Sequence, residues 1–106
     1  MSEANRISTA LLKRKLVASV NMFPVRSNYL WKNEIVRTSE VFMVMKTRLE
    51  RFVEVKQAIL ALHSYEVPAV AAVKVSRANT SYLEWIDSIV RKRRGRIVHQ
   101  KSSRNV

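Results

Sequence analysis

The sequence predicts a single α+β domain, and three observations support that prediction. A chain of 106 residues with 47% apolar side chains can build one hydrophobic core but is short for two domains. The stretch 16–47 contains two β-rich runs separated by a polar connection. Apolar residues recur at helical spacing before, between and after the strand-like segments. The predicted order is helix, strand, strand, helix, strand, helix.

The first helix is predicted over residues 2–15 and is followed almost directly by a long strand over residues 16–31. Pro24 lies in the middle of that strand and cannot donate a ladder hydrogen bond, so we expect a bulge, a bend or a change of partner there. The strand is also longer than the run that faces it. We therefore expect its outer half to extend beyond its partner and to pair with another chain.

The remaining elements follow the same patterns. A polar connection is predicted over residues 32–38 and a second strand over residues 39–47. A second helix over 48–63, a third strand over 67–75 and a third helix that opens at Ser81, with Gly95 suited to its end, complete the order. This order is the ferredoxin-like βαββαβ pattern without its first strand, plus a C-terminal helix. Because that strand is central in the sheet, either the natural product begins further upstream or the sheet closes around the gap.

The positive charge is concentrated at the C-terminus. The net charge is +12, and residues 91–106 carry seven basic residues and no acidic one, whereas residues 1–90 carry 13 basic and 8 acidic residues. We expect one domain over residues 1–95 and a basic, disordered tail over residues 96–106. The basic cluster in residues 91–104 also suits a phosphate-rich partner, so nucleic-acid binding is an alternative function.

Several classes of function have no support in the sequence. The chain has no cysteine, hence neither disulfides nor thiolate metal ligands, and no apolar run approaches the roughly 18 residues of a membrane span. No signal-peptide pattern is visible, which favours a cytoplasmic location. The residues also form no catalytic grouping and no glycine-rich phosphate loop, so we expect a protein that is not an enzyme.

Six short segments together resemble the CutA divalent-cation tolerance family in order and spacing, over residues 3–90. The segments are Ala18-Ser19-Val20-Asn21, Ser27-x-Tyr29-x-Trp31-Lys32, Ser39-Glu40-Val41, Lys46-Thr47, His63-x-Tyr65-Glu66-Val67-Pro68 and Tyr82-Leu83-x-Trp85-Ile86. The resemblance implies a ferredoxin-like subunit, a homotrimer built by strand pairing, and a link to copper and other divalent cations. It also implies a fold similar to the trimeric nitrogen-regulatory signalling proteins.

The sequence departs from the family pattern at two positions besides the absent first strand. The family usually has a cysteine, a proposed copper ligand, where this chain has Ser19, and a neutral hydroxyl is a poor ligand for a soft or borderline metal. Val25 stands where a glycine commonly follows the proline of the long strand. We therefore expect only weak copper binding.

His63 and Glu66 are the remaining metal-ligand candidates, since an imidazole and a carboxylate in one turn can share a divalent cation. The alternative is that His63 ends the second helix and Glu66 forms an ion pair. A cleft between subunits is predicted from half-polar aromatic side chains and a lysine, with plain packing as the alternative. Its residues are Tyr29, Trp31, Lys46, Tyr65 and Trp85. Met43 and Met45 alternate on one strand face, which favours core filling over soft-metal binding.

The favoured function is a non-enzymatic, homotrimeric protein of the CutA type that binds divalent metal, copper in particular, and acts in metal tolerance. Two alternatives remain at this point. One is a basic nucleic-acid-binding protein that uses the cluster in residues 91–104. The other is a trimeric scaffold that signals the presence of a small ligand, an analogy of fold alone.

Overall fold

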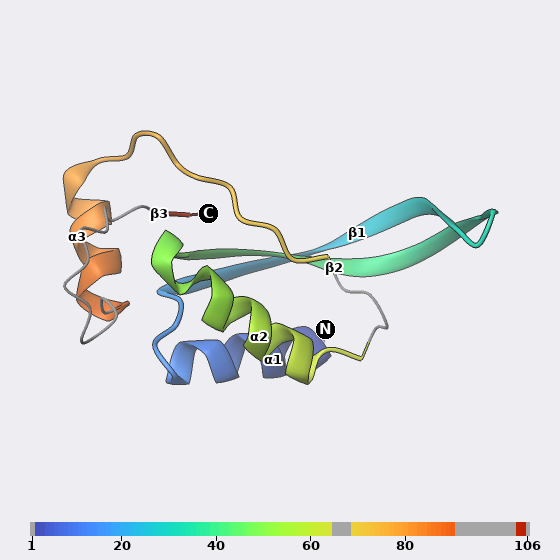
Figure 1. Ribbon diagram of the computed structural model, residues 1–106, viewed down its shortest axis with the longest axis horizontal. Coiled ribbons are helices and arrows are strands. Elements are labelled where there is room, and N and C mark those ends of the chain that lie inside the picture. Colours follow the sequence, from blue (N-terminus) through green and yellow to red (C-terminus); the bar gives the residue numbers. More distant parts are fainter. Residues whose placement is uncertain (1, 65–68, 91–103, 106) are drawn as a thin grey trace.

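The structure, a computed structural model, describes residues 2–64 and 69–90 and the backbone of residues 104–105. Its elements are α1 (Ser2–Lys13), β1 (Ser19–Trp31), β2 (Glu34–Arg48), the 3-10 turn η1 (Leu49–Arg51), α2 (Phe52–Leu62), α3 (Thr80–Ile89) and β3 (Arg104–Asn105). The two long strands form an antiparallel hairpin, α1 and α2 pack together beneath one half of it, and α3 lies beyond that same end (Figure 1). The predicted α+β class is confirmed.

The end of α1 explains why the strand follows with almost no loop. Lys15 has a positive φ of 57°, its N–H donates to the Leu12 carbonyl at 3.0 Å, and the Leu16 N–H donates to the Leu11 carbonyl at 3.1 Å. These two bonds and the left-handed residue form a Schellman cap, here without the usual glycine. Leu11 and Leu16 belong to one buried cluster. The cap therefore turns the chain directly from the helix into the core.

The hairpin is longer and more regular than the sequence indicated. All thirteen residues of β1 pair with β2 in one unbroken register, from Ser19 opposite Lys46 to Trp31 opposite Glu34. The connection is Lys32-Asn33, both with positive φ, which is the backbone of a two-residue type I′ turn. The prediction of a connection over residues 32–38 is therefore wrong, because residues 34–38 belong to β2.

Two expectations about β1 need correction. Pro24 lies opposite Val41 with no extra residue on either strand, so it causes neither a bulge nor a change of partner, and the third option, a bend, stays a prediction. The outer half of β1 is not left without a partner in its own chain, since β2 accompanies it to Trp31. The physical reason is the tight turn, which lets polar residues such as Arg37 and Thr38 continue the ladder although their side chains favour a loop.

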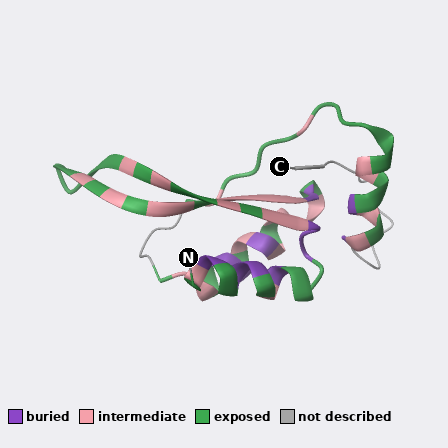
Figure 2. Ribbon diagram, turned by 180° about the vertical axis from the view of Figure 1, so that it is seen from behind, coloured by how far each residue is buried: buried purple, intermediate pink, exposed green. Residues whose placement is uncertain are grey.

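Directly opposite residues share a face of the hairpin. The helix face carries Val20 opposite Met45 and Met22 opposite Met43. Val20, Met43 and Met45 pack against the core cluster formed by α1, α2 and the segment between α1 and β1. Core filling by Met43 and Met45 is confirmed. The helices cover only the hairpin base, residues 19–25 and 40–48, and leave the hairpin tip, residues 26–39, exposed (Figure 2).

A second, smaller cluster holds α3 to the hairpin base through Ala18, Ile86 and Val90. Next to it, Arg48 is only 1% exposed and forms ion pairs with Glu50, at 2.6 Å, and with Asp87 of α3. Breaking such a buried pair would leave an uncompensated charge, so this contact fixes α3 at the end of β2.

The third strand predicted over residues 67–75 is not formed in its described part, residues 69–75, apart from an isolated bridge at Lys74. These residues are mostly exposed, Val73 to 65%, because no strand among the described residues pairs with them in a ladder. β3 pairs with Thr47 and Arg48, whereas most of the tail predicted over residues 96–106 lies outside the described residues. The four-stranded ferredoxin-like layout thus stays a prediction.

In the part of the chain described, no helix is long and apolar enough to cross a membrane.

Candidate functional site

The hairpin tip exposes several large apolar side chains. Leu30 and Ile35 lie opposite each other on the helix face and are 73% and 61% exposed. Tyr29 and Trp31 project from the other face, here called the open face, and are also exposed. On the same open face, at the base, Phe23 and Phe42 stack with ring centroids 5.3 Å apart. Apolar side chains exposed in this number mark an interaction surface.

The residues predicted to form one cleft are far apart within a single chain. Tyr29 and Trp31 share the open face with Lys46, but ten residues of strand, roughly 33 Å, separate Tyr29 from the Ser19 opposite Lys46. Trp85 lies on α3 and stacks on Tyr82 at a centroid distance of 6.2 Å. Tyr65 lies outside the described residues. The four described side chains, Tyr29, Trp31, Lys46 and Trp85, therefore do not form one cleft within a single chain. A cleft between chains stays a prediction.

Ser19, at the position where the family has cysteine, has a cationic neighbour. Lys46 lies directly opposite it on the open face, and the Lys46 ammonium donates to the Asn21 side-chain carbonyl. A cation bound at Ser19 would therefore meet a positive charge as well as a weak hydroxyl ligand. Weak copper binding at this position stays a prediction.

His63 ends α2, where its backbone N–H donates to the Ile59 carbonyl at 2.8 Å. Its predicted partner Glu66 lies outside the described residues. The structure instead places a different carboxylate nearby. The Ser64 backbone N–H donates to Glu3 of α1 at 3.1 Å, and hydrogen bonding to Ser64, followed by the charge of His63, holds the pKa of Glu3 below its usual value.

Arg6 completes this junction between the start of α1 and the end of α2. Its guanidinium donates to the Leu62 carbonyl at 3.0 Å and lies 3.7 Å from the Glu3 carboxylate. Sequence reasoning missed Glu3, because apolar periodicity predicts which helix faces meet but not which ends align across 61 residues. Within residues 2–64 and 69–90, no three carboxylate or imidazole groups lie together in a way that would hold a metal ion.

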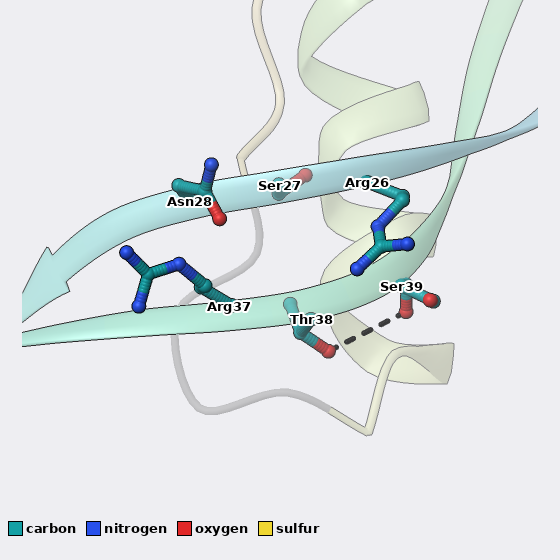
Figure 3. A pocket seen from close by; sticks show the side chains of 6 residues that line it. All are labelled: Arg26, Ser27, Asn28, Arg37, Thr38 and Ser39. Atoms are coloured by element: carbon teal, nitrogen blue, oxygen red, sulfur yellow. Dashed lines mark hydrogen bonds between the residues drawn. The ribbon is translucent and has the colours of Figure 1, made fainter.

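A belt of six polar residues crosses the hairpin tip between its apolar ends. It lines an open hollow of about 300 Å³, and Figure 3 shows its side chains on the two strands: Arg26, Ser27, Asn28, Arg37, Thr38 and Ser39. Sequence reasoning placed Arg37 and Thr38 in a loop and therefore missed the belt. The lysine-asparagine pair at the turn was the one signal that would have set the register.

The fold and this surface define a class of protein: a small α+β subunit whose long antiparallel hairpin projects from a two-helix layer. Residues 1–89 match the family described as CutA1 divalent ion tolerance protein, and the chain belongs to that family.

Similar proteins cover most of the chain. It is 41% identical over 90 residues to the divalent-cation tolerance protein CutA of Archaeoglobus fulgidus, covering 85% of this chain and 88% of that protein. It is 38% identical over 84 residues to the same-named protein of Thermotoga maritima, covering 79% and 83%. The solved structure of the A. fulgidus protein, described as periplasmic, superposes with a TM-score of 0.85 over 86% of this chain and 89% of that one. CutA1 of Oryza sativa gives 0.84 at 29% identity, covering 88% and 86%.

Proposed function

We propose that this chain is a non-enzymatic homotrimer that takes part in divalent-cation tolerance and binds copper weakly. Family membership supports the link to divalent cations, because the relatives carry that function in their names. The exposed hairpin tip supports the assembly, and it is the single observation on which the oligomeric part of the proposal depends.

The shape of the subunit argues that the hairpin tip has a partner. The Cα radius of gyration is 15.4 Å, whereas a compact domain of this length has about 13 Å. A two-stranded ribbon with no third layer is only marginally stable in water. Since the tip also exposes Leu30, Trp31 and Ile35, its folded form needs apolar cover from outside the subunit.

Further copies of the same chain are the partner that fits these observations. The described residues offer two open strand edges along the tip and, in residues 69–75, an extended apolar segment without a ladder. Cyclic symmetry places the tip of each subunit on the next and leaves no tip uncovered when the ring closes. Three copies are the number that the family resemblance implies.

Light scattering coupled to size exclusion tests the assembly. We expect about three times the 12.3 kDa chain mass at micromolar concentration. Trp31→Asp, which places a charge in the proposed interface, should give the chain mass. Val53→Asp is the matched control, because Val53 is a similarly exposed apolar residue on α2, away from the hairpin, and this variant should keep the trimer mass. A folded native monomer would contradict the proposal.

For the metal, His63 is the ligand on which the proposal relies, completed by groups of a second subunit or by water. Only neutral imidazole coordinates a metal ion, so copper binding should weaken in acid. Ser19→Cys should bind copper more tightly, since a thiol sulfur is a far better ligand for copper than a neutral hydroxyl.

Calorimetric titration with Cu(II) of the native protein, Ser19→Cys and His63→Ala measures these effects. His99→Ala, which removes the other histidine of the chain, is the matched control and should bind like the native protein. Equal affinity of the native protein and His63→Ala would exclude His63 as a ligand without affecting the trimer proposal.

A further inference from the structure

The polar belt at the hairpin tip has a charge arrangement that the proposed function does not use. Arg26 lies opposite Ser39 and Arg37 lies opposite Asn28, so the two guanidinium groups share the helix face as diagonal neighbours. Figure 3 shows Arg26 extending from β1 toward β2, whereas Arg37 extends from β2 along the ribbon toward Asn28, away from Arg26. Two like charges at such positions repel each other unless a counter-charge lies between them.

No acidic side chain of the hairpin shares that face. Glu34 lies opposite Trp31 and Glu40 lies opposite Val25, which puts both carboxylates on the open face. Within the described residues, neither Arg26 nor Arg37 forms an ion pair. Three arginines elsewhere in the described residues, Arg6, Arg48 and Arg51, each pair with a glutamate.

We propose that Arg26 and Arg37 form a binding site for a phosphate-type oxyanion on the helix face of the hairpin tip. Guanidinium groups bind tetrahedral oxyanions through paired, charge-assisted N–H···O bonds. On the same face the Asn28 amide and the Ser39 hydroxyl supply further donors. The hollow of about 300 Å³ is at the lower limit of ligand pockets, which fits a small anion and not an extended ligand.

The chemistry fits both free phosphate and a phosphomonoester. An anion between the two guanidinium groups would neutralise the repulsion across the ladder and order the tip. The site is therefore a ligand-dependent means of stiffening the hairpin, independent of the metal at His63. Inorganic phosphate and phenyl phosphate, tested in parallel, distinguish the two sources.

The test is a phosphate titration of the ¹⁵N-labelled protein at constant ionic strength, with chloride replaced by phosphate. The arginine Nε–Hε signals of Arg26 and Arg37 should shift along one common, saturable curve. Arg26→Gln and Arg37→Gln should each lower the phosphate affinity about tenfold or more, because each removes one charge-assisted pair of bonds. Arg14→Gln is the matched control, an exposed arginine at the end of α1 with the same change of charge, and should leave the affinity unchanged.

Two results would overturn the proposal. Shifts that grow linearly with phosphate, or an equal loss in Arg14→Gln, would mean non-specific screening. An unresponsive spectrum, together with a reduced assembly mass in both tip variants, would assign the arginine pair to contacts between copies of the chain. Tighter binding of phenyl phosphate than of phosphate would support the site and identify an ester as its ligand, and equal binding would support it with free phosphate as the ligand.

Discussion

The hairpin base and the hairpin tip share one uninterrupted ladder but have different surroundings. In the base, α1 and α2 cover the helix face, and Val20, Met43 and Met45 pack against buried Leu11 and Val17. In the tip, Leu30 and Ile35 occupy equivalent positions on the same face and remain mostly exposed. Identical backbone pairing therefore coexists with two levels of apolar burial.

The difference indicates what stabilises each half. A ladder hydrogen bond contributes only about 0.5–1.5 kcal/mol net, because the unfolded chain bonds to water instead. Burial of a large apolar side chain contributes about 1.5–3 kcal/mol, and only the base obtains it within the subunit. We expect the tip to obtain it from the proposed assembly. We expect the stability of the base to be independent of protein concentration and that of the tip to depend on it.

Matched leucine truncations should separate the two halves most strongly. Leu11→Ala removes a fully buried side chain at the base and should lower the free energy of unfolding by about 2–5 kcal/mol at every protein concentration. Leu30→Ala, at a site 73% exposed in the subunit, should instead weaken the assembly. Denaturant unfolding of both variants, each at two protein concentrations, measures both effects. A concentration-independent loss of similar size in Leu30→Ala would mean that the tip is buried within its own chain.

A change at the turn should affect the tip alone. Asn33 has a φ of 67°, a conformation that asparagine tolerates and alanine does not, so Asn33→Ala should cost about 1 kcal/mol. Asn33→Gly should cost little. Asn28→Ala, an asparagine within regular strand, is the control. Amide exchange should report faster opening in residues 27–38 of Asn33→Ala, with the base unchanged. Accelerated exchange in the base would show that the two halves unfold together.

The smallest expected effect concerns the pH dependence of the helices under the base. The pKa of Glu3 in the folded chain lies below its usual value of 4.5, so its bond to Ser64 stabilises the fold above that pH. The contribution is lost as the pH falls through the lowered pKa. Glu3→Gln should therefore be less stable than the native protein at pH 7 and equal to it in strong acid. Glu84→Gln, an exposed glutamate on α3, should give no such difference. A constant difference at all pH values would exclude the ionised carboxylate as the cause.

Much of the secondary structure follows from the sequence, because periodicity identifies helices and β-rich runs. The helices over residues 2–15 and 48–63 are found within two residues of their predicted ends, as α1 and as η1 with α2. The third helix begins one residue before Ser81, but α3 ends at Ile89, short of the predicted end at Gly95. Strand pairing is less predictable. Arg37 and Thr38 have loop-like side chains, and their place in β2 depends on a two-residue turn with positive φ at Lys32 and Asn33.

The candidate site was harder to predict than the fold. Residues chosen by type, such as Tyr29, Lys46 and Trp85, lie on different parts of the subunit, because shared chemistry does not fix distance. Glu3 approaches His63 only through the packing of α1 on α2. The diagonal placement of Arg26 and Arg37 could be predicted only from the correct register of the hairpin. An error of one residue in that register would place each arginine on the opposite face.

The central claim is that other copies of this chain cover the hairpin tip. Hydrogen exchange measured along a dilution series, with the mass recorded at each step, tests it most directly. In the assembled protein, amides of residues 27–38 should exchange as slowly as those of the base. On dilution they should become fast when the mass falls to that of one chain, while the base stays protected. Fast exchange of the tip in an assembled protein, or a slow tip in a 12.3 kDa monomer, would contradict the claim.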